Sequence, residues 1–132
     1  GTISKDAVKK ALDVVGLPYN DKKTFSQYSL GMKQRLGIAN AIMNDPELLI
    51  LDEPSNGLDP IGIASIRDFV RTLSRQGKTI LISSHNLSEI ALMADDIGII
   101  HKGILLEESS YMELEKKNRK YINASMVRPN LR

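Results

Sequence analysis

The stretch LLILDEPSNGLDPIGIASIRDFVRTLSRQGKTILISS (residues 48–84) contains two short apolar runs with a helical pattern between them. The first run, residues 48–51, is unbroken and ends in two acids and a proline, which predicts a strand buried on both faces of a parallel sheet. TILISS at residues 79–84 predicts a second such strand. Strand, helix and strand in this order form a βαβ unit, so the sequence predicts an α/β fold with a mainly parallel sheet.

The helical pattern between the two strands has defined ends. SNGLDP (residues 55–60) consists mostly of residues typical of turns. It predicts Asp59 as the N-cap of the helix and Pro60 as its first residue. Gly77 ends the helix. The predicted buried stripe consists of Ile63, Ile66, Phe69 or Val70, and Leu73.

The residues before this unit predict two helices. The first covers residues 5–15 and is capped by Ser4. The second begins near Ser29 and ends at Asp45-Pro46, because the residue before a proline avoids the helical conformation.

The residues after the unit predict a β-hairpin, DIGIIHKGILLEES at residues 96–109, which turns at Lys102-Gly103. Ser110 then begins a short helix. Residues 118–132 predict either a basic tail or one more strand at YINASMV.

Composition limits the classes of protein that this chain can represent. The 132 residues, 42% of them apolar, suit about one small domain. Lysine and arginine total 18 against 16 acids, and this near balance argues against a nucleic-acid partner held by bulk charge. The absence of cysteine excludes disulfides and thiolate metal sites, and the apolar runs are too short to span a bilayer. A cytosolic location is therefore expected.

Polar side chains follow both predicted strands. Asp52 and Glu53 end the first and His85 follows the second, and parallel sheets bind ligands at the carboxyl ends of their strands. Asp52 and Glu53 point to opposite faces, so one suits a hard cation, directly or through water, while the other suits orienting or deprotonating a water. His85 can donate to a phosphate oxygen. The alternative is that Asp52 and Glu53 are solvated acids at a strand end and that His85 is an exposed loop residue. His101 is expected to lie on the surface.

YSLGMKQR (residues 28–35) places a serine and a glycine at the start of a helix. The free N–H groups and positive dipole of a helix N-terminus favour an anion, and the Ser29 hydroxyl adds a donor. Gly31 permits close backbone approach, and Lys33, Gln34 and Arg35 follow. These features predict a phosphate contact. An ordinary serine N-cap is the alternative.

Taken together, these motifs resemble the nucleotide-binding subunits of ATP-binding cassette (ABC) transporters over nearly the whole chain. YSLGMKQR resembles the signature motif LSGGQ-x-Q-R, and LLILDEP resembles the Walker B strand with its catalytic glutamate. SNGLDP resembles the D-loop, and SSH, ending in His85, resembles the switch-histidine motif. Four motifs in the right order are far more specific than one. More loosely, the chain is similar to the ATPases of bacterial exporters of peptide antibiotics such as bacitracin and lantibiotics.

The resemblance implies a role for each matching residue in ATP hydrolysis coupled to transport. Asp52 would engage Mg²⁺ through water, Glu53 would be the general base, and His85 would contact the γ-phosphate. Family members work as a head-to-tail dimer of two nucleotide-binding subunits docked on a transmembrane permease at the inner face of the membrane. The ATP held by one subunit would be contacted by signature residues of the other, which here are Ser29, Gly31 and Gln34. Asp59 in the D-loop would couple the two sites.

The chain also departs from the family pattern. Tyr28, Leu30 and Met32 replace the usual leucine, first glycine and glutamine of the signature motif. Leu30 cannot easily take positive φ, so the backbone there must suit an ordinary residue.

A second departure is that no G-x-x-x-x-G-K-[ST] phosphate loop is present in the sequence. We therefore expect the carboxyl-terminal part of a longer subunit. Residues 1–45 would be part of the helical subdomain, 46–117 the second half of a P-loop ATPase core, and 118–132 a tail or strand. Such a chain alone should neither bind ATP tightly nor hydrolyse it. Its sheet should have an exposed apolar edge or face, because neighbouring strands are missing.

Two other functions remain compatible with the motifs. One is an ABC-type ATPase without a membrane partner, of the translation or DNA-repair class. The other is a non-catalytic interaction domain that retains the motifs.

Overall fold

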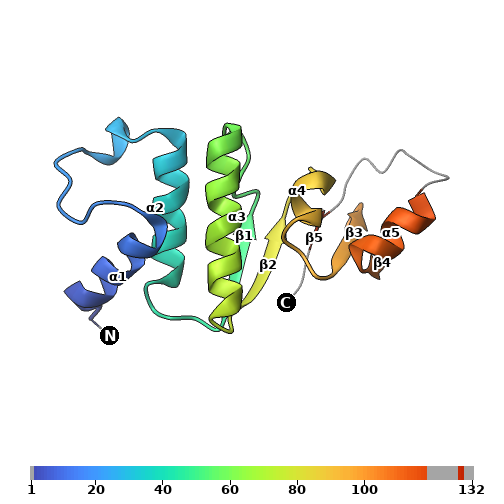
Figure 1. Cartoon of the computed structure of the whole chain (residues 1–132). Helices are drawn as coiled ribbons and strands as arrows, with labels where there is room; N and C mark the ends of the chain where they lie inside the picture. The colour runs from blue at the N-terminus through green and yellow to red at the C-terminus, as the bar shows by residue number, and fades with distance from the viewer. Residues whose placement is uncertain (1, 119–127, 130–132) are drawn as a thin grey trace.

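The computed structural model describes residues 2–118 and 128–129. Figure 1 shows two helices at one end of the molecule, a helix packed on two strands in the middle, and a hairpin with a short helix at the other end. The elements in chain order are α1 (Lys5–Val15), η1 (Phe25–Gln27), α2 (Leu30–Ile42), β1 (Leu48–Asp52), α3 (Pro60–Arg75), β2 (Thr79–Ser83), α4 (Leu87–Ala91), β3 (Ile97–His101), β4 (Ile104–Ser109), α5 (Tyr111–Asn118) and β5 (Arg128–Pro129).

The predicted βαβ unit is confirmed. Strands β1 and β2 pair in parallel, in a register that runs from Leu48 opposite Thr79 to Asp52 opposite Ser83. Helix α3 makes the crossover between them (Figure 1). It begins as predicted, with the Asp59 carboxylate accepting from the Gly62 N–H at 2.7 Å.

A second sheet, separate from the first, contains the predicted hairpin. Strands β3 and β4 are antiparallel, and β5 pairs with the other edge of β3. Lys102 and Gly103 have φ angles of 48° and 76°, as a tight hairpin turn requires. The possible strand at YINASMV lies outside the described residues.

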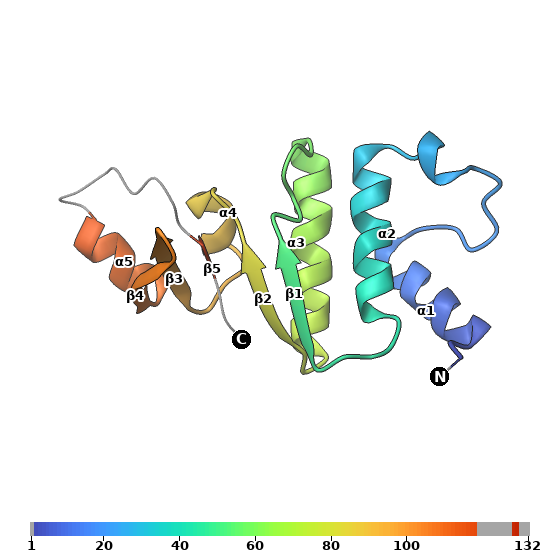
Figure 2. The same cartoon turned by 180° about the vertical axis from the view of Figure 1, so that it is seen from behind.

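Burial of β1 differs from the sequence prediction. Leu49 and Leu51 are buried, but Leu48 is 53% and Ile50 is 66% exposed, so the predicted burial of both strand faces was wrong. Helix α3 covers one face of the two strands, and Figure 2 shows the other face with no helix in front of it. The expected exposed apolar face is therefore present.

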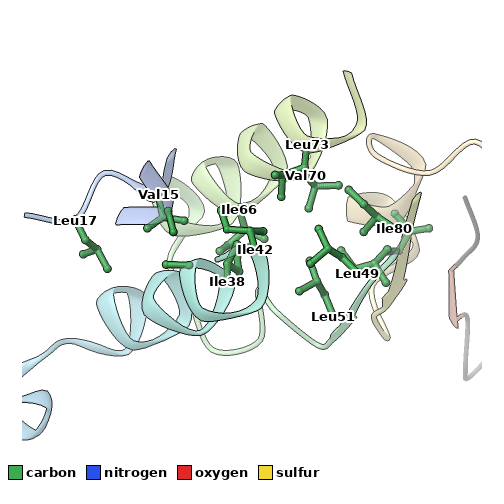
Figure 3. Packing of buried hydrophobic residues seen from close by; sticks show 14 of the residues in the cluster. Val15, Leu17, Ile38, Ile42, Leu49, Leu51, Ile66, Val70, Leu73 and Ile80 are labelled. Carbon is green, nitrogen blue, oxygen red and sulfur yellow. The ribbon is translucent and has the colours of Figure 1, made fainter. Parts of the chain in front are cut away.

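The core lies between α3, its neighbouring helix α2 and the covered face of the two strands (Figure 3). Helix α3 contributes Ile66, Val70 and Leu73, each at most 5% exposed, which confirms the predicted stripe in its central part. Ile63 and Phe69 are only half-buried. None of the helices in the described part of the chain has the length and apolar character needed to cross a membrane.

A charged contact fastens the loop between α2 and β1. Lys78 Nζ donates to Asp45 Oδ1 at 2.5 Å and to the Pro46 carbonyl at 2.8 Å. Asp45 has a φ of 51°, which an aspartate tolerates better than most residues. The hydrogen bond from Lys78, reinforced by its charge, lowers the pKa of Asp45 below its ordinary value of 3.8.

We predict that Ile66→Val lowers the free energy of unfolding by about 0.5–1.5 kcal/mol, because Ile66 is fully packed and the lost methyl leaves a gap. The matched control is Ile61→Val in the same helix, where the side chain is 77% exposed. The control should stay within about 0.5 kcal/mol of the parent chain. Urea unfolding followed by circular dichroism measures both, and equal effects of the two variants would contradict the assignment of the core.

We also predict that the destabilisation caused by Asp45→Asn depends on pH. A carboxyl whose pKa is lowered by folding contributes stability above its unfolded pKa, and that contribution is lost as the pH falls through the folded pKa. The melting temperature of Asp45→Asn should therefore lie below that of the parent near neutral pH, and the two should converge at about pH 2. In a Lys78→Met background the substitution should have little effect at any pH, and a difference that persists in acid would refute the pairing.

Candidate functional site

The predicted site residues gather at one end of the molecule. The carboxyl ends of β1 and β2 and the first residues of α2, α3 and α4 all lie at this end, which is uppermost in Figure 1. The loop after β1, residues 53–59, runs between them. This is the edge at which a parallel sheet binds its ligands.

Glu53 and His85 are in direct contact. His85 Nδ1 lies 3.2 Å from both carboxylate oxygens of Glu53, although the two residues are 32 positions apart. Their side chains are 34% and 67% exposed, for Glu53 and His85 respectively, so both can also reach a ligand. When Nδ1–H donates to Glu53, Nε2 is left free to face another polar group.

Ser83 connects the two acids. Its hydroxyl donates to Asp52 Oδ1 and accepts from the Glu53 N–H at 2.9 Å. The Glu53 N–H also donates to the Ser83 carbonyl at 3.1 Å. No role for Ser83 was predicted from the sequence. The only indication there is that a polar residue ends an apolar strand. The parallel register places it directly opposite Asp52.

Glu53 has a φ of 48°, in the left-handed region that glycine favours. A non-glycine residue held there costs about 1–3 kcal/mol, and such strain clusters at functional sites. The turn ends the strand at Asp52 and directs the Glu53 carboxylate toward His85. The Asp52 carboxylate stays exposed at the strand end.

The donor set at this edge fits one type of metal site. The described residues contain no group of three or more His, Cys, Asp or Glu able to hold a metal ion by themselves. Mg²⁺ commonly needs no such group, since it is held by one or two carboxylates together with water and substrate phosphates. Asp52 therefore fits Mg²⁺ that arrives with a phosphate ligand.

The start of α2 lies against the loop 53–59. Ser29 caps the helix by accepting from the Met32 N–H at 3.2 Å, and its hydroxyl proton can still be donated. A Cβ added to Gly57 would lie 3.1 Å from Leu30 Cδ2, and one added to Gly31 would lie 3.9 Å from Leu58 Cδ2. The signature-like stretch and the loop are thus direct neighbours.

The replaced residues of this stretch cause no backbone strain. Among the described residues, the non-glycine positions with positive φ are Asp45, Glu53 and Lys102. Leu30 begins α2 in ordinary helical conformation, as its identity requires. Met32 packs against the hydrophobic core, and Gln34 is half-buried further along the same helix.

The cavity beside the predicted site residues is small. A cavity of about 130 Å³ is bordered by Glu53 and His85. A larger one of about 600 Å³ lies at the opposite ends of α2 and α3, beside Lys78, and none of the predicted site residues borders it. The larger cavity therefore does not coincide with the predicted site.

Comparison with known proteins agrees with the motifs. The family model described as ABC transporter matches residues 3–56. The bacitracin transport ATP-binding protein BcrA of Enterococcus faecalis is 64% identical over 122 residues, which cover 92% of this chain and 40% of that protein. The lantibiotic transport ATP-binding protein SrtF of Streptococcus pyogenes is 50% identical over 109 residues, which cover 83% of this chain and 48% of that protein.

A solved structure has the same fold. The structure of cbiO1 from Clostridium perfringens, part of the ABC transporter complex cbiONQ, superposes with a TM-score of 0.74 and 28% identity. The match covers 89% of this chain and 50% of that one. The chain thus spans half or less of the length of these relatives. On the motifs, the fold and these identities, the chain belongs to the ATP-binding domains of ABC transporters.

Proposed function

We propose that this chain is part of the ATP-hydrolysing subunit of an ABC exporter that carries a peptide antibiotic. The observation that carries the proposal is the contact between Glu53 and His85, beside Asp52, at the carboxyl edge of the parallel strands. The bacitracin and lantibiotic transport proteins among its relatives support the choice of substrate class. Residues 1–45 would belong to a helical subdomain, residues 46–117 to the ATPase core, and residues 118–132 to a tail or strand.

Each residue at the edge has chemistry that suits phosphoryl transfer. Asp52, exposed and fixed by Ser83, would hold Mg²⁺ through water, and the ion would neutralise phosphate charge. Glu53 would orient the attacking water and accept its proton. His85 in its imidazolium form, with Nδ1–H donating to Glu53, would present Nε2–H to the γ-phosphate. Catalysis would consist of positioning and charge neutralisation.

The start of α2 would serve ATP held by a second subunit. Ser29 offers a hydroxyl donor, Gly31 leaves the backbone accessible, and Gln34 follows on the same helix. In a head-to-tail dimer, these groups would face the partner's nucleotide, and Asp59 would couple the two sites. The dimer would dock on a permease at the cytoplasmic face of the membrane.

We predict that Glu53→Gln in the complete subunit lowers the rate of ATP hydrolysis roughly 100- to 10,000-fold, because the amide cannot accept a proton from water. ATP binding should be retained, since the substitution removes one negative charge and no phosphate contact. Phosphate release and fluorescent-nucleotide binding measure the two effects. Glu115→Gln, an exposed position on α5, is the matched control. Unchanged hydrolysis by Glu53→Gln would show that Glu53 is not the general base.

We further predict complementation between two inactive subunits. If Ser29 serves the partner's nucleotide, a heterodimer of Ser29→Ala and Glu53→Gln subunits contains one site with both residues intact. Its rate of ATP hydrolysis should approach about half that of the parent dimer, whereas either homodimer is inactive. Differently tagged subunits purified in tandem provide the heterodimer. A heterodimer as inactive as the homodimers would show that both residues act within one subunit.

A further inference from the structure

The loop 53–59 has a second connection to the segment that carries His85. The Ser55 hydroxyl donates to Glu89 Oε2 at 2.6 Å, across 34 positions of sequence. Ser55 is only 6% exposed, and Glu89 is half-buried. A short hydrogen bond from a buried hydroxyl to a carboxylate is charge-assisted and stronger than a neutral one. Ser55 is the first residue of the SNGLDP stretch, but the sequence predicted no role for it or for Glu89.

The other oxygen of Glu89 orders the residues around His85. Glu89 Oε1 accepts from Asn86 Nδ2 at 3.2 Å. Asn86 caps α4 by accepting from the Ser88 N–H at 3.0 Å, and its own N–H donates to the Ser84 hydroxyl at 3.0 Å. The residues on both sides of His85 are therefore linked to the Glu89 carboxylate.

Backbone hydrogen bonds extend this connection along the loop. The Asn56 N–H donates to the Glu53 carbonyl at 3.1 Å, and the Leu58 N–H donates to the Ser55 carbonyl at 3.2 Å. The position of Ser55 is thus tied to that of Glu53 before it and of Leu58 after it. The cavity of about 130 Å³ described above is bordered by Ser55 and Glu89 as well as by Glu53 and His85.

We propose that Glu89 is a positioning residue, which acts through Ser55 to fix the Glu53 carboxylate relative to His85. The inference rests on the proposed ATPase function. Glu89 touches neither Glu53 nor His85 in any contact described above; it sets their separation by holding the two segments that carry them. A displacement of about 1 Å in such a pair is enough to slow a reaction roughly 100-fold.

The kinetic test uses Ser55→Ala in the complete subunit, because this variant removes the donor and adds no bulk. The kcat for ATP hydrolysis should fall about 10- to 100-fold with little change in KM, and Ser55→Thr, which keeps the hydroxyl, should restore it. The matched control is Ser65→Ala, since the Ser65 hydroxyl donates to the Ile61 carbonyl of its own helix. Parent-like kcat in Ser55→Ala, or equal losses in Ser55→Ala and Ser55→Thr, would overturn the proposal.

A spectroscopic test separates this inference from the proposed function. In the 132-residue chain, the imidazole ¹⁵N and ¹H signals of His85 report its contact with Glu53 without any turnover. Ser55→Ala and Glu89→Ala should both shift these signals, Glu89→Ala the more because it also removes the contact with Asn86. The double variant should shift them no further than Glu89→Ala. Unmoved His85 signals, or additive shifts, refute the positioning role. A complete subunit without ATPase activity refutes the proposed function, and the His85 signals then still decide this inference.

Discussion

The site depends on the parallel register that places Ser83 opposite Asp52. This pairing brings one hydroxyl within reach of the Asp52 carboxylate and of the Glu53 N–H. It also places His85, two residues further on, beside the Glu53 carboxylate. A slip of one residue would turn every side chain of a strand to the opposite face, and would separate these groups. The buried stripe of α3 opposes such a slip, because it packs only on the face that carries Leu49 and Leu51.

Local patterns in the sequence predicted the helices and strands. Contacts between residues that are distant in sequence could not be predicted from them. The caps Ser4, Ser29 and Asp59 were found because each accepts from an N–H three residues later. The gathering of Asp52, Glu53 and His85 followed from a general rule for parallel sheets. The hydrogen bonds donated by Ser83 and Ser55 join residues more than thirty positions apart, so no local sequence pattern predicts them. Burial of β1 was overestimated because composition does not reveal which face is covered.

The start of α2 packs against the loop 53–59 through Leu30 and Gly57. Leu30 stands where the family has a glycine, and its side chain occupies space that a Cβ on Gly57 would enter. Gly57 also has a φ of 77°, which few other residues adopt. A side chain at residue 57 would therefore have to displace Leu30 or the loop. Because the two positions are far apart in sequence, only the fold relates them.

Glu53 has a positive φ, as Asp45 and Lys102 also have, and contacts of its N–H and carboxylate hold it in this conformation. A backbone at a φ of 48° is least strained with glycine. The glutamate instead adopts this conformation with its N–H held by both oxygens of Ser83 and its carboxylate against His85. The strain is thus offset by contacts that fix one carboxylate at one place. Such fixation suits a group that meets a ligand at the edge of the sheet.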